Sequence, residues 1–348
     1  MLNDIVKPLT EWYRQNKRSL PWRDRHNAYY TWVSEIMLQQ TRVEAVKPYF
    51  RRFTEELPDP AALAECPEEK LLKLWEGLGY YNRVRNMQIA AQTVVEEYDG
   101  VLPASYEELL SLKGIGSYTA GAIASIAYDI PVPAVDGNVL RVITRIIEDD
   151  GDIMKQSVKK RIENKLQEIM PGEYPGDFNQ ALMELGAVVC VPNGEPKCDV
   201  CPVAFCCGAR AHGTIDRFPV KAQKKDRKLE DRTVLVIQDG EKTAIRRRPS
   251  RGLLAGLYEL PNFKGHLSEE EVLESVKAMD LEPLRIEALP EAKHIFSHIE
   301  WRMTAYRVRV SSLEEIRQND LLFVGKRQSD DQYAIPSAFS AYTKYIRE

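Results

Sequence analysis

The chain has 348 residues, 44% of them hydrophobic and 29% charged, with a formal net charge of −4 at neutral pH. This length allows two domains of ordinary size, and the composition is typical of a soluble globular protein. It contains no run of about 18 apolar residues and no apolar segment near its start, so we expect neither a transmembrane helix nor a signal peptide. A reducing cytosol is the expected setting, where clustered cysteines bind metal more often than they form disulfides.

The net charge argues mildly against a nucleic-acid partner, because DNA-binding proteins usually carry a basic surface. Residues 1–215 hold 24 Lys and Arg against 30 Asp and Glu, so the first part of the chain is not basic either. Any binding of DNA must therefore depend on local geometry and not on bulk charge.

Residues 1 to about 215 are predicted to be almost wholly helical. Apolar residues recur at helical spacing in 32–50, 68–78 and 157–170, and Gly and Pro mark the joins between these segments. The stretch LKGIGSYTAGAI, residues 112–123, predicts two helices joined by a glycine hairpin. Its glycines permit a tight turn with positive φ and leave the backbone bare, so the amides of Gly114 and Gly116 can face an anion. A DNA phosphate fits such a site, and a plain packing joint between two helices is the alternative.

Two carboxylates are candidate catalytic residues. Glu35 in WVSEIMLQQT has apolar neighbours on its predicted helix, and burial there would raise its pKa and make it an acid. The alternative for Glu35 is a solvated helical position. Asp136 in PAVDGNVLRV precedes a helix, where the alternative is an N-cap role for which Asn138 could compete. Together, one apolar-flanked acid and one polar-flanked carboxylate are the pair that glycosidic chemistry uses.

Five of the six cysteines lie within residues 190–207. The spacing is C-x7-C-x2-C, and Cys206 or Cys207 follows as a fourth thiol. Four thiolates suit zinc or an iron–sulfur cluster equally well by ligand count. Cys66 stands alone in an alanine-rich stretch and is predicted to be a buried small residue.

The character of the chain changes after the cysteines. Residues 218–231 are charged and poor in apolar residues, which predicts a linker. Beyond them, RTVLVIQ and KTAIRRR flank Asp239-Gly240, a pattern typical of a β-hairpin. A helix over 268–280, with a capping box at Ser268 and Glu271, and a strand over 294–310 complete an α/β domain.

These pieces together closely resemble the MutY-type adenine DNA glycosylases of the helix–hairpin–helix superfamily. The resemblance covers nearly the whole chain and includes LPWR (20–23), WVSEIMLQQTRVE (32–44), WEGLGYYNRVRN (75–86), LKGIGSYTAGAI, AVDGNVLRV (134–142), FNQALMELGA (178–187) and the cysteines. It implies an all-α helix–hairpin–helix glycosylase domain over 1–217, with the helix–hairpin–helix at 105–127 and an iron–sulfur cluster loop at 190–207. A linker over 218–231 and a Nudix-like α/β domain over 232–348, which recognises 8-oxoguanine, would follow.

The resemblance implies removal of adenine mispaired with 8-oxoguanine or guanine in duplex DNA. Glu35 matches the general acid that protonates the flipped adenine at N7, and Asp136 matches the carboxylate that stabilises the oxocarbenium-like sugar. The adenine pocket of the family matches Leu20, Trp22, Arg23, Leu38 and Gln180, and the residues that wedge into the duplex match Gln40 and Tyr80. Two residues that support the site match Tyr118 and Asn138. The loop that reads the oxidised base matches Phe296, Ser297 and His298.

One position separates subclasses of the superfamily. Relatives that also cut the DNA strand carry a Schiff-base lysine after the hairpin, whereas this chain has Tyr118 there. The resemblance therefore implies a monofunctional glycosylase, a hydrolase of N-glycosyl bonds. The GLLAGLYELP stretch (252–261) is similar to the start of a Nudix segment, but the following acidic helix lacks the Mg²⁺-binding pattern, which implies binding without hydrolysis.

The family spacing of cysteines is C-x6-C-x2-C-x5-C, and this chain has one extra residue in the first gap. A loop with Gly and Pro absorbs such an insertion, and the x5 gap selects Cys207 over Cys206. The resemblance thus implies a [4Fe–4S] cluster that performs no chemistry, held by Cys190, Cys198, Cys201 and Cys207.

We expect the protein to act on duplex DNA as a monomer in the bacterial cytosol or nucleoid, away from membranes. Three alternatives remain at this point. They are a glycosylase for thymine or oxidised pyrimidines, a non-catalytic iron–sulfur module that binds DNA or carries electrons, and a Nudix-type pyrophosphatase.

Overall fold

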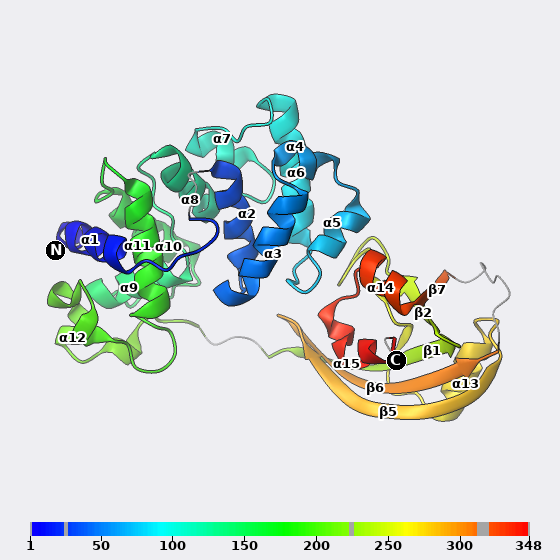
Figure 1. The fold of residues 1–348 in the computed structure, drawn as a ribbon. Coiled ribbons are helices and arrows are strands. Elements are labelled where there is room, and N and C mark those ends of the chain that lie inside the picture. Colours follow the sequence, from blue (N-terminus) through cyan, green and yellow to red (C-terminus); the bar gives the residue numbers. More distant parts are fainter. Residues whose placement is uncertain (1, 24–26, 223–225, 312–319, 347–348) are drawn as a thin grey trace. The chain divides into compact units, whose positions relative to one another are not determined.

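The computed structural model describes residues 2–23, 27–222, 226–311 and 320–346. The chain forms two compact units, Met1–Cys66 with Arg85–Gln223 and Pro67–Val84 with Lys224–Glu348 (Figure 1). The predicted division, with one boundary near residue 217, differs from this arrangement because the segment 67–84 groups with the C-terminal part of the chain. No helix among the described residues is long and apolar enough to cross a bilayer.

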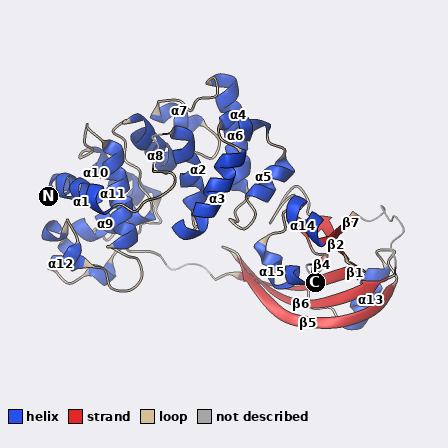
Figure 2. Cartoon of the chain, viewed as in Figure 1, coloured by secondary structure: helices blue, strands red, loops and turns tan. Residues whose placement is uncertain are grey.

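Helices build the first unit, and the sheet belongs to the second (Figure 2). The helices that precede the sheet in the chain are α1 (Val6–Asn16), α2 (Ala28–Leu38), α3 (Val43–Glu56), α4 (Pro60–Glu65), α5 (Glu68–Leu74), α6 (Asn82–Glu97), α7 (Tyr106–Ser111), α8 (Ser117–Tyr128), α9 (Gly137–Ile147), α10 (Gln156–Gln167), α11 (Pro175–Val188) and α12 (Gly208–Ala211).

Helix α11 is central to the first unit, since it packs against α1, α8 and α9, while α2 packs against α3 and α8. The core that joins α1, α9, α10 and α11 contains the fully buried side chains of Leu9, Ile143, Ile162 and Leu182. This packing brings α2, α8, α9 and α11 together, and these four helices carry the residues singled out above for chemistry.

The predicted helix–hairpin–helix forms from α7 and α8. Gly114 has a φ of +79°, and a Cβ added there would approach the Cβ of Asn86 to 2.7 Å, so the turn requires glycine. Gly116 is the N-cap of α8 with a φ of −99°. The expected left-handed conformation is therefore confirmed for Gly114 and wrong for Gly116, although both glycines are exposed.

The second unit contains a seven-stranded sheet with the order β3-β2-β1-β6-β5, in which β4 also pairs with β1 and β7 with β2. Strands β1 and β6 are parallel, and the other pairs are antiparallel. The elements are β1 (Lys228–Asp239), β2 (Lys242–Arg247), β3 (Tyr258–Glu259), β4 (Asn262–Lys264), α13 (Glu269–Lys277), β5 (Pro283–Ile295), β6 (Ile299–Val310), β7 (Leu321–Gly325), α14 (Lys326–Gln332) and α15 (Ser340–Thr343).

Both faces of the sheet are covered. On β1, Val234 and Val236 face a core that includes Phe339 near the C-terminus, whereas Leu235 and Ile237 face α13. This alternation follows from the two-residue period of a strand.

Several local predictions for the second unit can be compared with the structure. The hairpin is confirmed, with Asp239 paired to Lys242 across a two-residue turn, and the capping box at Ser268 and Glu271 is present. The last four residues of the predicted linker belong to β1, because they pair with β6 from Lys228 onward. The rest of that linker includes residues 223–225, which lie outside the described residues.

The single strand predicted over 294–310 is wrong. Strand β5 ends at Ile295, residues 296–298 turn, and β6 begins at Ile299. The turn is closed by a hydrogen bond from the Phe296 amide to the Ile299 carbonyl oxygen at 2.8 Å. The triplet Phe296, Ser297 and His298 is thus a turn between two strands.

The segment 67–84 joins the second unit through polar contacts. The ammonium group of Lys73 donates to the carbonyl oxygens of Ser329 and Tyr333 at 3.2 and 3.0 Å, and Glu76 accepts from the Ile335 amide at 2.7 Å. These partners lie about 260 residues apart in the sequence, and local periodicity carries no information about such pairing.

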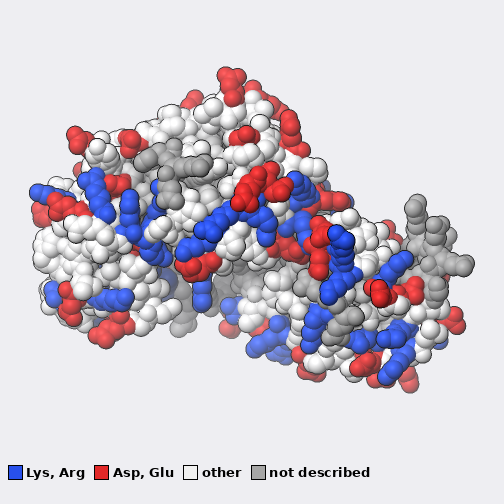
Figure 3. All heavy atoms as spheres, in the orientation of Figure 1, with Lys and Arg blue, Asp and Glu red and all other residues white. Residues whose placement is uncertain are grey.

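Charges of both signs are interspersed over the face of the molecule in Figure 3. This mixture agrees with the formal net charge of −4. Any contact with DNA would then depend on local groups and not on bulk charge, as expected from the composition.

Candidate active site

Glu35 lies on α2, beside Val33, Ile36 and Met37, each of which is at most 2% exposed. Glu35 itself is 7% exposed, so the predicted buried face is confirmed and the solvated alternative is wrong. The hydroxyl of Tyr118, on the first turn of α8, donates a hydrogen bond to its Oε2. Burial raises the pKa of Glu35 to about 7, against the lowering effect of the Tyr118 hydrogen bond. Near neutral pH this carboxyl can therefore hold a proton and give it up.

Asp136 is the N-cap of α9. Its side chain accepts hydrogen bonds from the amides of Asn138 and Val139 at 2.9 and 2.8 Å and from the Asn138 side-chain amide at 2.6 Å. The N-cap interpretation is thus confirmed for Asp136 and not for Asn138. Burial raises the pKa of Asp136, while the three hydrogen bonds lower it. The surroundings of Asp136 are more polar than those of Glu35, as predicted. They do not cancel the rise in the pKa of Asp136 that burial causes.

Asn138 is held in place from the side opposite Asp136. Its Oδ1 accepts a hydrogen bond from Nη2 of Arg141 at 3.0 Å, and the same guanidinium donates to the carbonyl oxygens of Gly186 and Cys190 at 2.8 and 2.9 Å. A Cβ at Gly186 would approach the Asn138 Cβ to 2.6 Å, so α11 can come this close only with glycine. These contacts fix the Asn138 amide group toward Asp136.

Glu35 and Asp136 line one cavity of about 780 Å³ in the first unit. Ten of the residues predicted for the site line it: Leu20, Trp22, Arg23, Glu35, Leu38, Gln40, Tyr118, Asp136, Asn138 and Gln180. They come from α2, α8, α9 with its N-cap, α11 and the segments on either side of α2, so the fold brings together what the sequence scatters over 160 residues.

Glu184, a further carboxylate in this cavity, is not among the residues predicted for the site. It is 1% exposed on α11 and accepts hydrogen bonds from Arg18 at 2.6 and 3.0 Å and from Arg23 at 2.7 Å. Burial alone would raise the pKa of Glu184, but the hydrogen bonds from Arg18 and Arg23 outweigh it and lower the pKa to about 2. The signal was present in QALMELGA, where Glu184 has apolar neighbours just as Glu35 does.

The other predicted substrate residues lie in the second unit. Ser297 and His298 are exposed in the β5–β6 turn, while Phe296 is half-buried. Tyr80, 49% exposed and with a φ of +48°, is hydrogen-bonded through its hydroxyl to the Ser297 hydroxyl at 2.9 Å. Within this unit, the residue predicted to wedge into the duplex thus meets the turn predicted to read the oxidised base.

The clustered thiols surround an apolar hollow beside α9, lined by Cys190, Cys198, Cys201 and Cys207. The thiol of Cys206 is not part of this lining and donates to the Val203 carbonyl oxygen at 3.4 Å. Among the residues the structure describes, no three Cys, His, Asp or Glu side chains lie close enough together to share one metal ion. By ligand count, four such thiolates suit zinc or an iron–sulfur cluster equally well. Cys66 is 6% exposed, as predicted.

Two parts of this chain match known protein families, and most of the chain matches known proteins. Residues 33–171 match the model of the HhH-GPD superfamily base excision DNA repair proteins, and residues 233–345 match the NUDIX domain. An adenine DNA glycosylase of Mus musculus is 36% identical over 86% of this chain and 69% of its own length. One of Buchnera aphidicola subsp. Acyrthosiphon pisum is 32% identical over 87% of this chain and 86% of its own length.

The chain belongs to the adenine DNA glycosylases. As a member of this family it is a DNA repair enzyme and a hydrolase of N-glycosyl bonds. A solved structure of a thermostable thymine-DNA glycosylase matches 60% of this glycosylase and 96% of its own chain, with 25% identity and a TM-score of 0.54. The glycosylase therefore has the expected helix–hairpin–helix fold followed by a Nudix-like α/β domain.

Family membership decides among the alternatives that the sequence left open. A Nudix-type pyrophosphatase and a non-catalytic iron–sulfur module are both wrong, because the relatives that match most of this glycosylase are adenine DNA glycosylases. The thymine-DNA glycosylase shares its fold at 25% identity, whereas the relatives at 36% and 32% identity are adenine DNA glycosylases.

Proposed function

We propose that this glycosylase removes adenine mispaired with 8-oxoguanine or guanine in duplex DNA. The observation that carries the proposal is the placing of Glu35 and Asp136 in one cavity, one carboxyl with a pKa of about 7 and the other held by three N–H donors. The names of the relatives support adenine as the leaving base.

Adenine must leave the base stack to reach this cavity, which costs a few kcal/mol. The cavity volume of about 780 Å³ accommodates a nucleoside. Leu20, Trp22 and Leu38 would provide apolar walls for the base, and Arg23 and Gln180 would provide polar groups at its edge. Because Glu184 holds the Arg23 guanidinium, this edge of the pocket is already ordered before the base arrives.

Neutral adenine is a poor leaving group and needs a proton as the glycosidic bond breaks. The Tyr118 hydroxyl occupies Oε2 of Glu35, which leaves Oε1 to donate the proton to N7 of adenine. With a pKa of about 7, Glu35 carries that proton at neutral pH far more often than an exposed glutamate would.

Bond cleavage leaves positive charge on the sugar, and Asp136 would stabilise it as an anion. The amides of Asn138 and Val139 and the side chain of Asn138 hold this carboxylate before the reaction, so little reorganisation is needed. Water then adds to the sugar, and the proton that the water loses returns to the carboxylate of Glu35, which completes hydrolysis and restores the acid.

The four thiols that line the hollow, Cys190, Cys198, Cys201 and Cys207, would hold a [4Fe–4S] cluster. Such a cluster, when bound, cross-links the loop that carries it. The exposed amides around Gly114 and Gly116 would bind a DNA phosphate. In the second unit, the exposed Ser297 and His298 would read the base opposite adenine by hydrogen bonds.

The direct test is single-turnover release of adenine from a duplex that holds adenine opposite 8-oxoguanine. We expect release from this duplex and from one with adenine opposite guanine, and none from a matched duplex with adenine opposite thymine. Absence of release from the 8-oxoguanine duplex would overturn the proposal.

We expect no strand cleavage to accompany base release. Tyr118 stands where lyases of the superfamily carry a lysine, and a phenol cannot form a Schiff base with the sugar. Product strands should therefore appear on a denaturing gel only after alkali treatment, and borohydride should trap no covalent complex. Cleavage without alkali in an amount equal to base release would contradict the assignment of Tyr118.

Cys207→Ser should lower iron content, whereas Cys206→Ser should not, because Cys207 lines the hollow with the other three thiols. Iron per protein chain and the absorbance of the cluster measure both variants. The two substitutions remove the same atom from adjacent positions, so each is the control for the other. Iron loss with Cys206→Ser alone would reverse the choice of fourth ligand.

Ser297→Ala combined with His298→Ala should narrow the preference for 8-oxoguanine over guanine by about tenfold, since each hydrogen bond contributes about 0.5–1.5 kcal/mol. The measured quantity is the ratio of single-turnover rates on the two duplexes. Ser275→Ala with His266→Ala removes the same groups from other positions in the second unit and should leave the ratio unchanged. An unchanged ratio in the first variant would exclude the turn from recognition.

A further inference from the structure

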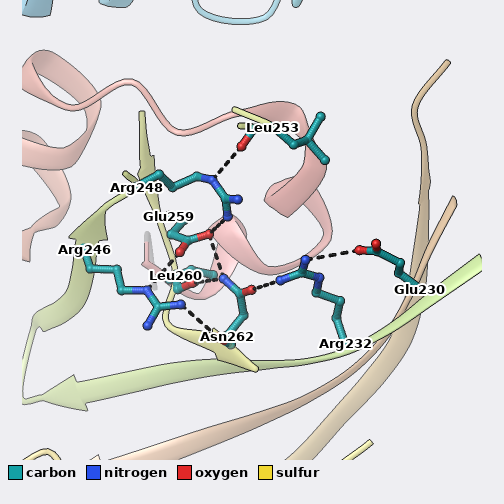
Figure 4. Close-up of polar contacts among 8 residues, drawn as sticks. All are labelled: Glu230, Arg232, Arg246, Arg248, Leu253, Glu259, Leu260 and Asn262. Carbon is teal, nitrogen blue, oxygen red and sulfur yellow. Dashed lines mark hydrogen bonds and ion pairs between the residues drawn. The ribbon is translucent and has the colours of Figure 1, made fainter. Parts of the chain in front are cut away.

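A buried carboxylate in the second unit binds two arginines. Glu259, on β3, is 2% exposed. Its Oε1 accepts from Nε of Arg246 at 2.9 Å, and its Oε2 accepts from Nη1 of Arg248 and from Nδ2 of Asn262 at 2.8 Å. Arg248 also donates to the Leu253 carbonyl oxygen at 2.9 Å. Figure 4 shows these groups as one continuous series of polar contacts. A buried charge with this many partners has little freedom to move.

The series continues across Asn262 to the first strand of the sheet. Nη1 of Arg232 donates to Oδ1 of Asn262 at 2.9 Å, and Nη2 donates to Glu230 at 3.2 Å (Figure 4). Both ends of the network then meet one aromatic ring. The guanidinium carbons of Arg232 and Arg248 lie 4.4 and 6.0 Å from the ring centroid of Trp301, which is fully buried.

Trp301 connects this network to the turn predicted to read the oxidised base. Its ring centroid lies 4.9 Å from that of Phe296, with the planes at 71°. Phe296 begins the turn, and its amide closes it by the bond to Ile299. Any shift of the Trp301 ring would therefore move the base of the turn and, with it, Ser297 and His298.

We propose that Glu259, Asn262, Arg232, Arg248 and Trp301 form a positioning network that sets the orientation of the 296–298 turn and so the discrimination of the base opposite adenine. This inference rests on the proposed recognition role of that turn. None of the five touches the base; they act through Phe296. The energetic scale fits, because a cation over a buried indole ring contributes about 0.5–2 kcal/mol, which corresponds to roughly twofold to thirtyfold in a rate ratio.

The chain offers a matched pair of variants. Arg232→Met removes the guanidinium nearest Trp301 but keeps an apolar stem of similar length. Arg307→Met makes the same change at a guanidinium outside the proposed network, whose carbon lies 4.7 Å from the ring centroid of Tyr345. Among the described residues, the guanidinium groups over the Trp301 ring are those of Arg232 and Arg248, so Arg307 serves as the control.

The readout is the ratio of single-turnover rates with adenine opposite 8-oxoguanine and opposite guanine, at a temperature where circular dichroism shows each variant folded. We expect Arg232→Met to lower the ratio about fivefold to tenfold, with the rate opposite guanine within twofold of wild type. Arg307→Met should leave the ratio within twofold. A merely structural role would lower the melting temperature of both variants and leave both ratios unchanged, which would overturn the inference.

Phe296→Leu tests the contact between Trp301 and the turn from the side of the turn. This variant can still refute the inference if Arg232→Met fails to fold. It preserves apolar volume but removes the ring that meets Trp301, and the ratio should again fall. An unchanged ratio in this variant contradicts the network. Failure of the proposed function would look different, since wild-type protein would then release no adenine. Failure of the turn's role would leave the Ser297→Ala, His298→Ala ratio unchanged.

Discussion

Glu35→Gln should slow adenine release from the 8-oxoguanine duplex by about 10²–10⁴-fold, the usual contribution of a general acid. Glutamine has nearly the same shape, and its carbonyl oxygen can still accept the hydrogen bond from Tyr118, so the cavity should persist. What the variant lacks is the proton. Single-turnover rates with enzyme in excess measure the chemical step apart from product release.

Glu44→Gln is the matched control. Glu44 has a side chain 78% exposed on α3, where it pairs with Lys47 at 2.7 Å, and it does not line the cavity. The same chemical change there should leave the rate unaltered. If Glu35→Gln retained the full rate, the assignment of the acid would be wrong while family membership would stand.

The pH dependence of the wild-type rate follows from the same residue. Burial raises the pKa of Glu35 to about 7, so the protonated form dominates below that pH and is lost above it. The rate should fall about tenfold per pH unit above the pKa, because only the protonated carboxyl can act as the acid. A rate that stays constant from pH 6 to pH 9 would contradict a titrating acid at this position.

Local features of this chain were predictable where one element carries the whole signal. The apolar flanks of Glu35 predicted its burial, because three neighbours on one helix decide how much water reaches it. The hairpin at Asp239 and the capping box at Ser268 depend on residues within four positions of each other. Gly114 likewise needs its left-handed conformation for a turn only a few residues long.

Features that depend on distant partners were not predictable in this way. Strand β5 was not predicted because most of its residues are exposed and it contains two prolines, Pro283 and Pro290, so it lacks an alternating apolar pattern. It forms because β6 offers a paired edge over nearly its full length. The segment 67–84 joins the second unit by contacts that span some 260 residues.

The candidate site also contains features that could be predicted from the sequence and features that depend on distant partners. The family resemblance named ten of the residues in the cavity, but Glu184 escaped it because its importance comes from Arg18 and Arg23. These partners lie more than 160 residues away in the sequence. The pKa of Asp136 could not be foreseen either, since burial by other helices opposes the local hydrogen bonds.

Asp136→Asn should slow adenine release by about 10²–10³-fold, the usual cost of removing one group that stabilises charge in the transition state. The substitution removes the negative charge but keeps an N-cap, because asparagine caps helices about as well as aspartate. Its carbonyl oxygen can still accept from the amides of Asn138 and Val139. Stability should therefore change little, and affinity for the 8-oxoguanine duplex should be retained in an anisotropy assay.

Asp59→Asn separates the two roles of Asp136. Asp59 is the N-cap of α4, where it accepts from the Ala62 amide at 2.8 Å, and it does not line the cavity. If capping were all that Asp136 did, both variants would melt alike and both would release adenine at the wild-type rate. If Asp136 faces the sugar cation, only its own variant loses rate, with the melting temperature and DNA affinity preserved. The difference between the two variants then measures the charge alone.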